Sequence, residues 1–156
     1  MKIAKLLLLV ISILSLLGCK KGTDSEMARS SLIITQQPKI TLVLKDVTPD
    51  SATVTIYNGS ADSISYGSQY KFILEKQIDG IWYVCERATR TADGHHITAT
   101  DIERVLESGM TDEYQISWEH LYGDLPAGKY RFVKEIETAS SLSSTGDPFA
   151  TEFEIE

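Results

Sequence analysis

Hydrophobic and polar residues alternate with a period of two over most of the chain beyond residue 38, and this period is typical of β-strands. The alternation runs through residues 40–45, 52–57, 113–118, 130–136 and 151–155. Pro49 lies between the first two runs, in a segment that predicts a turn and therefore a hairpin. Residues 101–106 leave two readings open, a single helical turn or an irregular strand.

A second hairpin is predicted around Asp79 and Gly80, and its register has two alternatives. A two-residue loop places Cys85 opposite Leu74. A three-residue loop, with Gly80 left-handed in a bulge, turns Trp82 onto the same face as Leu74. We predict the three-residue loop, because it buries Trp82 and leaves Glu75 outside.

About seven short strands, separated by turn signals and with almost no helix, predict an all-β antiparallel sandwich. We assign this domain to residues 38–156. Residues 19–37 are polar apart from residues 32–34, and we predict a flexible tether there, with a short edge strand over 32–35 as an option.

The first 18 residues have the layout of a secretory signal peptide. Lys2 and Lys5 precede an uncharged apolar run over residues 6–17. Such a run is too short for a membrane-spanning helix, which needs roughly 20 apolar residues. We therefore predict export from the cytoplasm.

The end of this segment, Leu16-Leu17-Gly18-Cys19, resembles the lipobox of bacterial lipoproteins. The resemblance implies cleavage after Gly18 and acylation of Cys19, with chains such as palmitate. Two or more acyl chains hold a protein stably on a membrane. The expected location is the outer face of the cell membrane, or the outer membrane in a two-membrane bacterium.

Charge and cysteine content exclude several classes of protein. The chain has 15 basic and 22 acidic residues, a net charge of −7, which becomes −9 once Lys2 and Lys5 are removed. Nucleic acid is not an expected partner, because phosphate contacts need Lys and Arg. With Cys19 acylated, Cys85 stands alone, so neither a disulfide framework nor a four-cysteine zinc site is predicted.

Leu125-Pro126 with Gly128 and Tyr130 resembles the tyrosine corner of Greek-key sandwiches, in which a Tyr at the start of a strand bonds back to upstream backbone. A buried tyrosine needs such a partner. The resemblance implies a structural role for these four residues.

A longer stretch, residues 40–155, resembles the bacterial Ig-like domains of lipoproteins and surface proteins, chiefly of Gram-positive bacteria. The resemblance implies a sandwich at the cell surface, with no cofactor and no catalytic residue. The residues that carry it are Tyr66-Gly67, Tyr70, 79–83 with Trp82, 118–123 with Trp118, 125–131 and Lys134-Glu135.

Few residues suggest chemistry. His95 and His96 are adjacent, and adjacent residues of an extended chain point to opposite sides, so no metal site is predicted. Residues 118–122 are aromatic and are read as core or corner packing, with a binding platform as the less favoured alternative. Glu152, Glu154 and Glu156 are read as charges that protect a strand edge.

The sequence thus predicts a noncatalytic, lipid-anchored extracytoplasmic domain that binds or presents a protein or cell-wall partner. Loops 58–69 and 87–101 are the expected contact regions. The main alternative is an inhibitor or regulator of a surface enzyme. A small hydrolase using His95 or His120 with a carboxylate is the weaker one.

Overall fold

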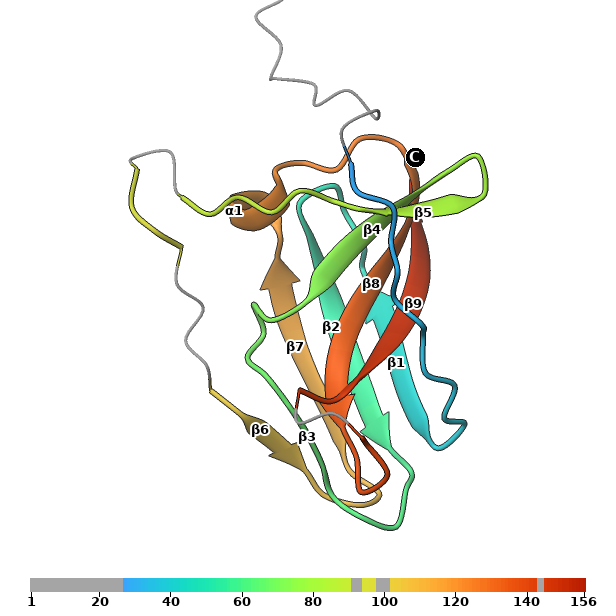
Figure 1. Cartoon of the computed structure of the whole chain (residues 1–156). Helices are drawn as coiled ribbons and strands as arrows, with labels where there is room; N and C mark the ends of the chain where they lie inside the picture. The colour runs from blue at the N-terminus through green and yellow to red at the C-terminus, as the bar shows by residue number, and fades with distance from the viewer. Residues whose placement is uncertain (1–26, 91–93, 98–101, 143–144) are drawn as a thin grey trace, which may run out of the picture.

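Two antiparallel sheets packed face to face form the structure, a computed structural model that describes residues 27–90, 94–97, 102–142 and 145–156 (Figure 1). The predicted all-β sandwich is confirmed. The elements are β1 (Ile40–Lys45), β2 (Ser51–Asn58), β3 (Ile64–Tyr66), β4 (Ile73–Ile78), β5 (Ile81–Val84), β6 (Arg104–Leu106), β7 (Thr111–Ser117), α1 (Glu119–Tyr122), β8 (Gly128–Glu137) and β9 (Asp147–Ile155).

The first sheet has the order β1-β2-β7. The predicted hairpin around Pro49 is present, and it pairs Leu42 with Ile56. Alternate residues of these strands face the second sheet and are buried, among them Val54 and Ile116. The period of two in the sequence therefore corresponds to one core face and one solvent face.

In the second sheet, β8 is the central strand. β9 pairs with one side of β8, while β3 and β4 share its other side. β5 extends this sheet beyond β4, and β6 extends it beyond β3. Residues 67–72 therefore form an excursion between two strands that bond to the same neighbour. Residues 104–106, left open between a helical turn and a strand, form β6.

The β4–β5 register differs from the prediction. Trp82 pairs with Gln77, so the loop has two residues, Asp79 and Gly80, and the predicted three-residue loop is wrong. Both loop residues have positive φ, 50° and 79°, as a type I′ turn requires. This turn matches the twist of the strands, and it places Trp82 on the outer face beside Glu75 instead of in the core.

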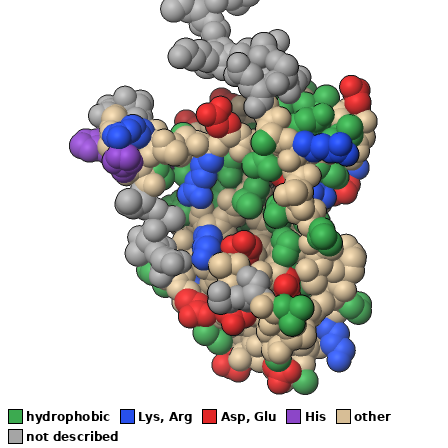
Figure 2. Space-filling model, in the orientation of Figure 1, with side chains coloured by type: hydrophobic (Ala, Val, Ile, Leu, Met, Phe, Trp, Pro, Cys, Tyr) green, Lys and Arg blue, Asp and Glu red, His purple; other side chains and the backbone are tan. Residues whose placement is uncertain are grey.

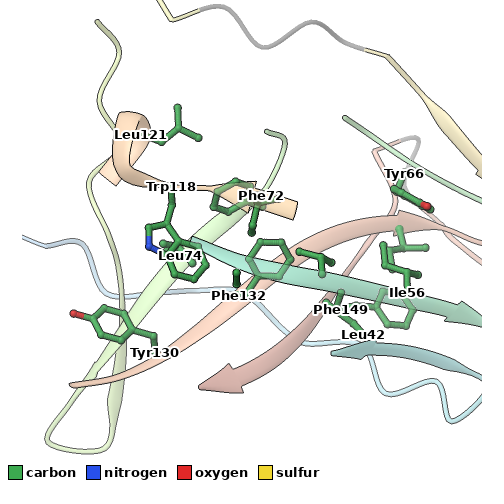
Figure 3. Packing of buried hydrophobic residues seen from close by; sticks show 14 of the residues in the cluster. Leu42, Ile56, Tyr66, Phe72, Leu74, Trp118, Leu121, Tyr130, Phe132 and Phe149 are labelled. Carbon is green, nitrogen blue, oxygen red and sulfur yellow. The ribbon is translucent and has the colours of Figure 1, made fainter. Parts of the chain in front are cut away.

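Aromatic and aliphatic side chains from both sheets meet in the space between them (Figure 3). Phe72 and Phe132 lie at its centre, with their ring centroids 4.9 Å apart. Leu121 of α1 is buried against the same cluster, so the short helix covers one end of the core. Within the described residues, no helix is both long enough and apolar enough to cross a bilayer.

The described part of the predicted tether lies against the domain. The Val84 amide donates to the Ala28 carbonyl at 2.8 Å, and the Ser30 amide donates to the Trp82 carbonyl at 2.9 Å. Further along, the Thr35 amide donates to the Pro148 carbonyl at 2.7 Å. Residues 28–35, which we call the strap, are therefore bonded to β5 at one end and to β9 at the other.

Candidate functional site

The predicted corner residues come together where β8 begins. Tyr130 is buried in the core, and its hydroxyl donates a 2.7 Å hydrogen bond to the Pro126 carbonyl, four residues upstream. Leu125 is buried beside it, and its amide donates to the Pro49 carbonyl of the β1–β2 turn. The corner thereby joins the two sheets at this end, which is a structural role.

Trp118 lies at the same end and is fully buried. Its indole N–H donates to the Pro49 carbonyl at 2.8 Å, and its ring stacks on Phe153, with centroids 5.5 Å apart. Phe153 in turn stacks on Tyr130. The less favoured idea of a binding platform at residues 118–122 is wrong for Trp118, because that ring has no surface left to offer a ligand.

Lys134 is the least expected feature of the core. It interrupts the hydrophobic alternation of β8, and its side chain is 0% exposed. Its ammonium nitrogen donates to three carbonyls of the excursion between β3 and β4, those of Gly67, Ser68 and Lys71, at 2.6–2.9 Å. Three acceptors match the three N–H donors of a protonated lysine, so this one side chain fixes the excursion to β8.

The electrostatics around Lys134 follow from its burial. Burial lowers the pKa of the Lys134 ammonium group to about 7, and the positive charges of Arg104 and Lys71 act in the same direction. Nearby, Arg104 forms an ion pair with Asp112 at 2.9 Å, and Asp112 accepts a 2.6 Å hydrogen bond from Tyr66. Burial, followed by this hydrogen bond, raises the pKa of the Tyr66 phenol well above its usual value.

A polar pocket of about 460 Å³ opens beside this network. Three carboxylates and one lysine contribute to its wall, so its field favours cationic groups. Figure 2 shows acidic and basic side chains mixed on this face. No histidine or cysteine is among the lining residues that the structure describes, which are Ser65, Tyr66, Gly67, Lys71, Glu103, Glu135, Glu137 and Thr145.

A second charged cluster lies on the outer face of β4, β5 and β8. Glu75 is 0% exposed and pairs with Arg131, whose guanidinium lies 4.6 Å from the centre of the Trp82 ring. The other carboxylate oxygen of Glu75, Oε1, has no hydrogen-bond partner among the described residues. The sequence predicted Glu75 outside the core, and the structure places it on the outer face of the sheet, although its side chain is buried there beside Arg131.

The remaining candidates stay apart. His95 and His96 are exposed, and the backbone of His96 forms an isolated β-bridge with Arg90. Figure 2 shows histidine side chains at the left edge of the molecule. His120 is exposed on α1. Among residues 27–90, 94–97, 102–142 and 145–156, no three metal-binding side chains gather. Burial raises the pKa of the Cys85 thiol to about 12, so the thiol is poorly nucleophilic at neutral pH.

Loop 58–69, an expected contact region, begins at a buried anchor. Asn58 is 0% exposed, and its amide group donates to the carbonyls of Asp62 and Leu106. Its side-chain oxygen accepts from the amide and the hydroxyl of Ser60. The anchor fixes the start of the loop and leaves Asn58 no role at the surface. The other expected region, 87–101, is described only at residues 87–90 and 94–97.

The four residues of the predicted cleavage and lipidation site, Leu16, Leu17, Gly18 and Cys19, lie outside the described residues. Sequence reasoning had identified Lys134 only as an exception to the alternation, and it missed the partners of that side chain. Those partners come from an excursion more than sixty residues upstream.

Comparison with known proteins decides the family. Residues 36–153 match the bacterial Ig-like domain family. The chain belongs to this family. As an Ig-like domain it is of a noncatalytic type, and its two-sheet architecture agrees with the match. Membership suggests an extracellular surface protein.

No curated protein matches the chain. Among solved structures, the Ig-like domain is similar to part of a penta-heme cytochrome c552 from Thermochromatium tepidum, with 14% identity and a TM-score of 0.34. The match covers 76% of this chain, which spans 40% of the cytochrome. A likeness this low supports no inference about fold or function.

Proposed function

We propose that this protein is a lipoprotein whose Ig-like domain is held outside the cytoplasm by acyl chains on Cys19 and binds or presents a partner there. The single observation that carries the proposal is the apolar run over residues 6–17 that ends in Leu16-Leu17-Gly18-Cys19, upstream of the Ig-like domain. Each buried methylene of an acyl chain contributes about 0.8 kcal/mol to membrane binding, so two or three chains are a stable anchor.

The domain itself supports a binding role over a catalytic one. Its buried polar groups serve the fold: Lys134 fixes the excursion, and Asn58 fixes a loop. The pocket beside β3 has polar walls and an acidic field, which suits the binding of a polar partner. The partner is a protein or a cell-wall component, and the net charge of −9 disfavours nucleic acid.

The test of the anchor uses the two cysteines of the chain as a matched pair. Cells that express the protein are fed a labelled fatty acid. Cys19→Ser is expected to abolish labelling and to leave the precursor uncleaved or released, whereas Cys85→Ser is expected to keep full labelling. Label retained in Cys19→Ser would overturn the proposal. Crosslinking on intact cells then identifies the captured neighbour.

A further inference from the structure

The strap crosses the outer face of the second sheet. It is bonded to β5 at Ala28 and Ser30, and to β9 at Thr35. β5 and β9 lie on opposite sides of the β4–β8 pair, and the inner face of that pair is filled by the core. The strap passes from one to the other across the outer face of this sheet, as Figure 1 shows.

Burial on that face agrees with this path. Val133 alternates with residues that face the core, yet it is only 1% exposed. Within the strap, Leu32 and Ile34 are half-buried, while Ile33 between them is 86% exposed. The strap thus presents alternate apolar side chains to the sheet, as an added strand would.

The two ends of the strap lie at different levels of the sandwich. Ala28 is bonded to Val84, which lies level with Glu75 and Arg131 near the start of β8, whereas Pro148, the partner of Thr35, lies level with Glu135 near the end of β8. β1, which follows the strap, begins at Ile40, and Ile40 pairs with Asn58. Because Asn58 is the anchor of the turn over residues 59–63, the chain that follows the strap enters β1 at the end of the domain far from the β4–β5 turn (Figure 1).

We propose that the strap sets which end of the domain faces the membrane, an inference that rests on the proposed lipid at Cys19. With the strap bonded, eight residues separate Cys19 from Ala28, so Ala28 and the neighbouring start of β8 stay within roughly 30 Å of the lipid. Turns 59–63 and 107–110 then point outward. With the strap released, the tether leaves the domain at Ile40, and these same turns are drawn toward the membrane.

Energy transfer from each end of the domain to the membrane tests this polarity. The mature chain, residues 19–156 with Cys85→Ser, is coupled through Cys19 to a maleimide lipid in phosphatidylcholine vesicles. A donor dye is attached to an azide-bearing amino acid at the exposed position 79 or 110, and an acceptor dye is attached to lipid headgroups. Lys76, near position 79, lies level with Tyr130, and Tyr66, toward the other end of the sheet, lies level with Ile136; the six residue steps between these two β8 residues span about 20 Å. We therefore expect at least about twofold stronger energy transfer from position 79 than from position 110.

Release of the strap should make energy transfer from positions 79 and 110 equal, or make transfer from position 110 the stronger. The test variant is Leu32→Ser with Ile34→Ser, and the matched control is Ile33→Ser, which changes the exposed residue between them. Ser30→Pro with Thr35→Pro removes the two amide donors and serves as a second test variant; near-UV circular dichroism checks that each variant is folded. Equal energy transfer from positions 79 and 110 in the protein with the natural strap sequence would overturn the proposal. So would transfer that stays stronger from position 79 in both folded test variants.

The chemical coupling separates this inference from the proposed function. If Cys19 is not acylated in cells, the labelling experiment fails while the vesicle experiment still reports the polarity of the strap. If the strap does not orient the domain, the vesicle experiment fails while acyl labelling of Cys19 is unaffected.

Discussion

The hydroxyl of Tyr130 donates a 2.7 Å hydrogen bond to the carbonyl of Pro126 inside the otherwise apolar end of the sandwich. Tyr130 is buried, and this hydrogen bond compensates for the desolvation of its hydroxyl. This relationship therefore stabilises the fold at the point where β8 enters the core.

Tyr130→Phe removes only the hydroxyl. We expect the free energy of unfolding to fall by about 1–2 kcal/mol, measured by urea denaturation, because the Pro126 carbonyl is left without its donor. Tyr70→Phe, at an exposed tyrosine, is the control and should be nearly silent. Equal effects of the two substitutions would argue against the corner.

The Lys134 ammonium group should make stability depend on pH. Its pKa is about 7 in the folded protein and returns to its ordinary 10.5 on unfolding. Between these values the unfolded chain binds a proton that the folded chain lacks, so this group makes the fold more stable as pH rises. Relative to Lys134→Met, we expect the wild-type unfolding free energy to increase from about pH 7 to about pH 9, with a slope of at most about 1.4 kcal/mol per pH unit.

The measurement is a series of urea titrations of both proteins at several pH values, since the difference between them removes the groups that they share. Below about pH 7 the difference should be flat, because Lys134 is then protonated in both states. A difference that stays constant up to pH 9 would show that the folded pKa of Lys134 is near its ordinary value.

Gly80→Ala tests the two-residue turn. A Cβ added at Gly80 meets no atom within 4 Å, so any cost comes from the positive φ of 79° alone. We expect a loss of roughly 1 kcal/mol in thermal or urea unfolding, the penalty for a side chain in the left-handed region. Asp79→Asn, which tolerates positive φ, should leave stability nearly unchanged.

Cys85 should react slowly in the folded protein. Its thiol is held in the neutral form by burial, with the pKa raised to about 12, and the thiolate is the reactive species. With Cys19 blocked, we expect little modification by a maleimide at neutral pH until denaturant is added. An introduced Asp79→Cys thiol, at an exposed position, is the comparison. Comparable native-state rates at both positions would contradict the burial argument.

Local patterns in the sequence were enough to predict the sandwich, because the alternation in a strand depends only on which neighbours face the core. The same patterns could not predict the burial of Lys134 or Glu75. Lys134 is satisfied by carbonyls from a distant excursion, and Glu75 is paired with Arg131 of β8. Both depend on chain segments far away in the sequence, which no local period reports.

The β4–β5 register failed for a related reason. Trp82 is a large apolar residue, and burial in the core was the simplest expectation for it. In the structure it packs instead against the guanidinium of Arg131, on the outer face. The dipeptide Asp79-Gly80, a strong signal for a two-residue type I′ turn, was the better guide.

The most direct test of the whole account is the intact mass of the native protein extracted from membranes. We predict a chain that begins at Cys19 and carries the added mass of two or three acyl chains, and that partitions into the detergent phase. A chain that begins at Met1, carries no acyl mass and partitions into the aqueous phase would contradict it.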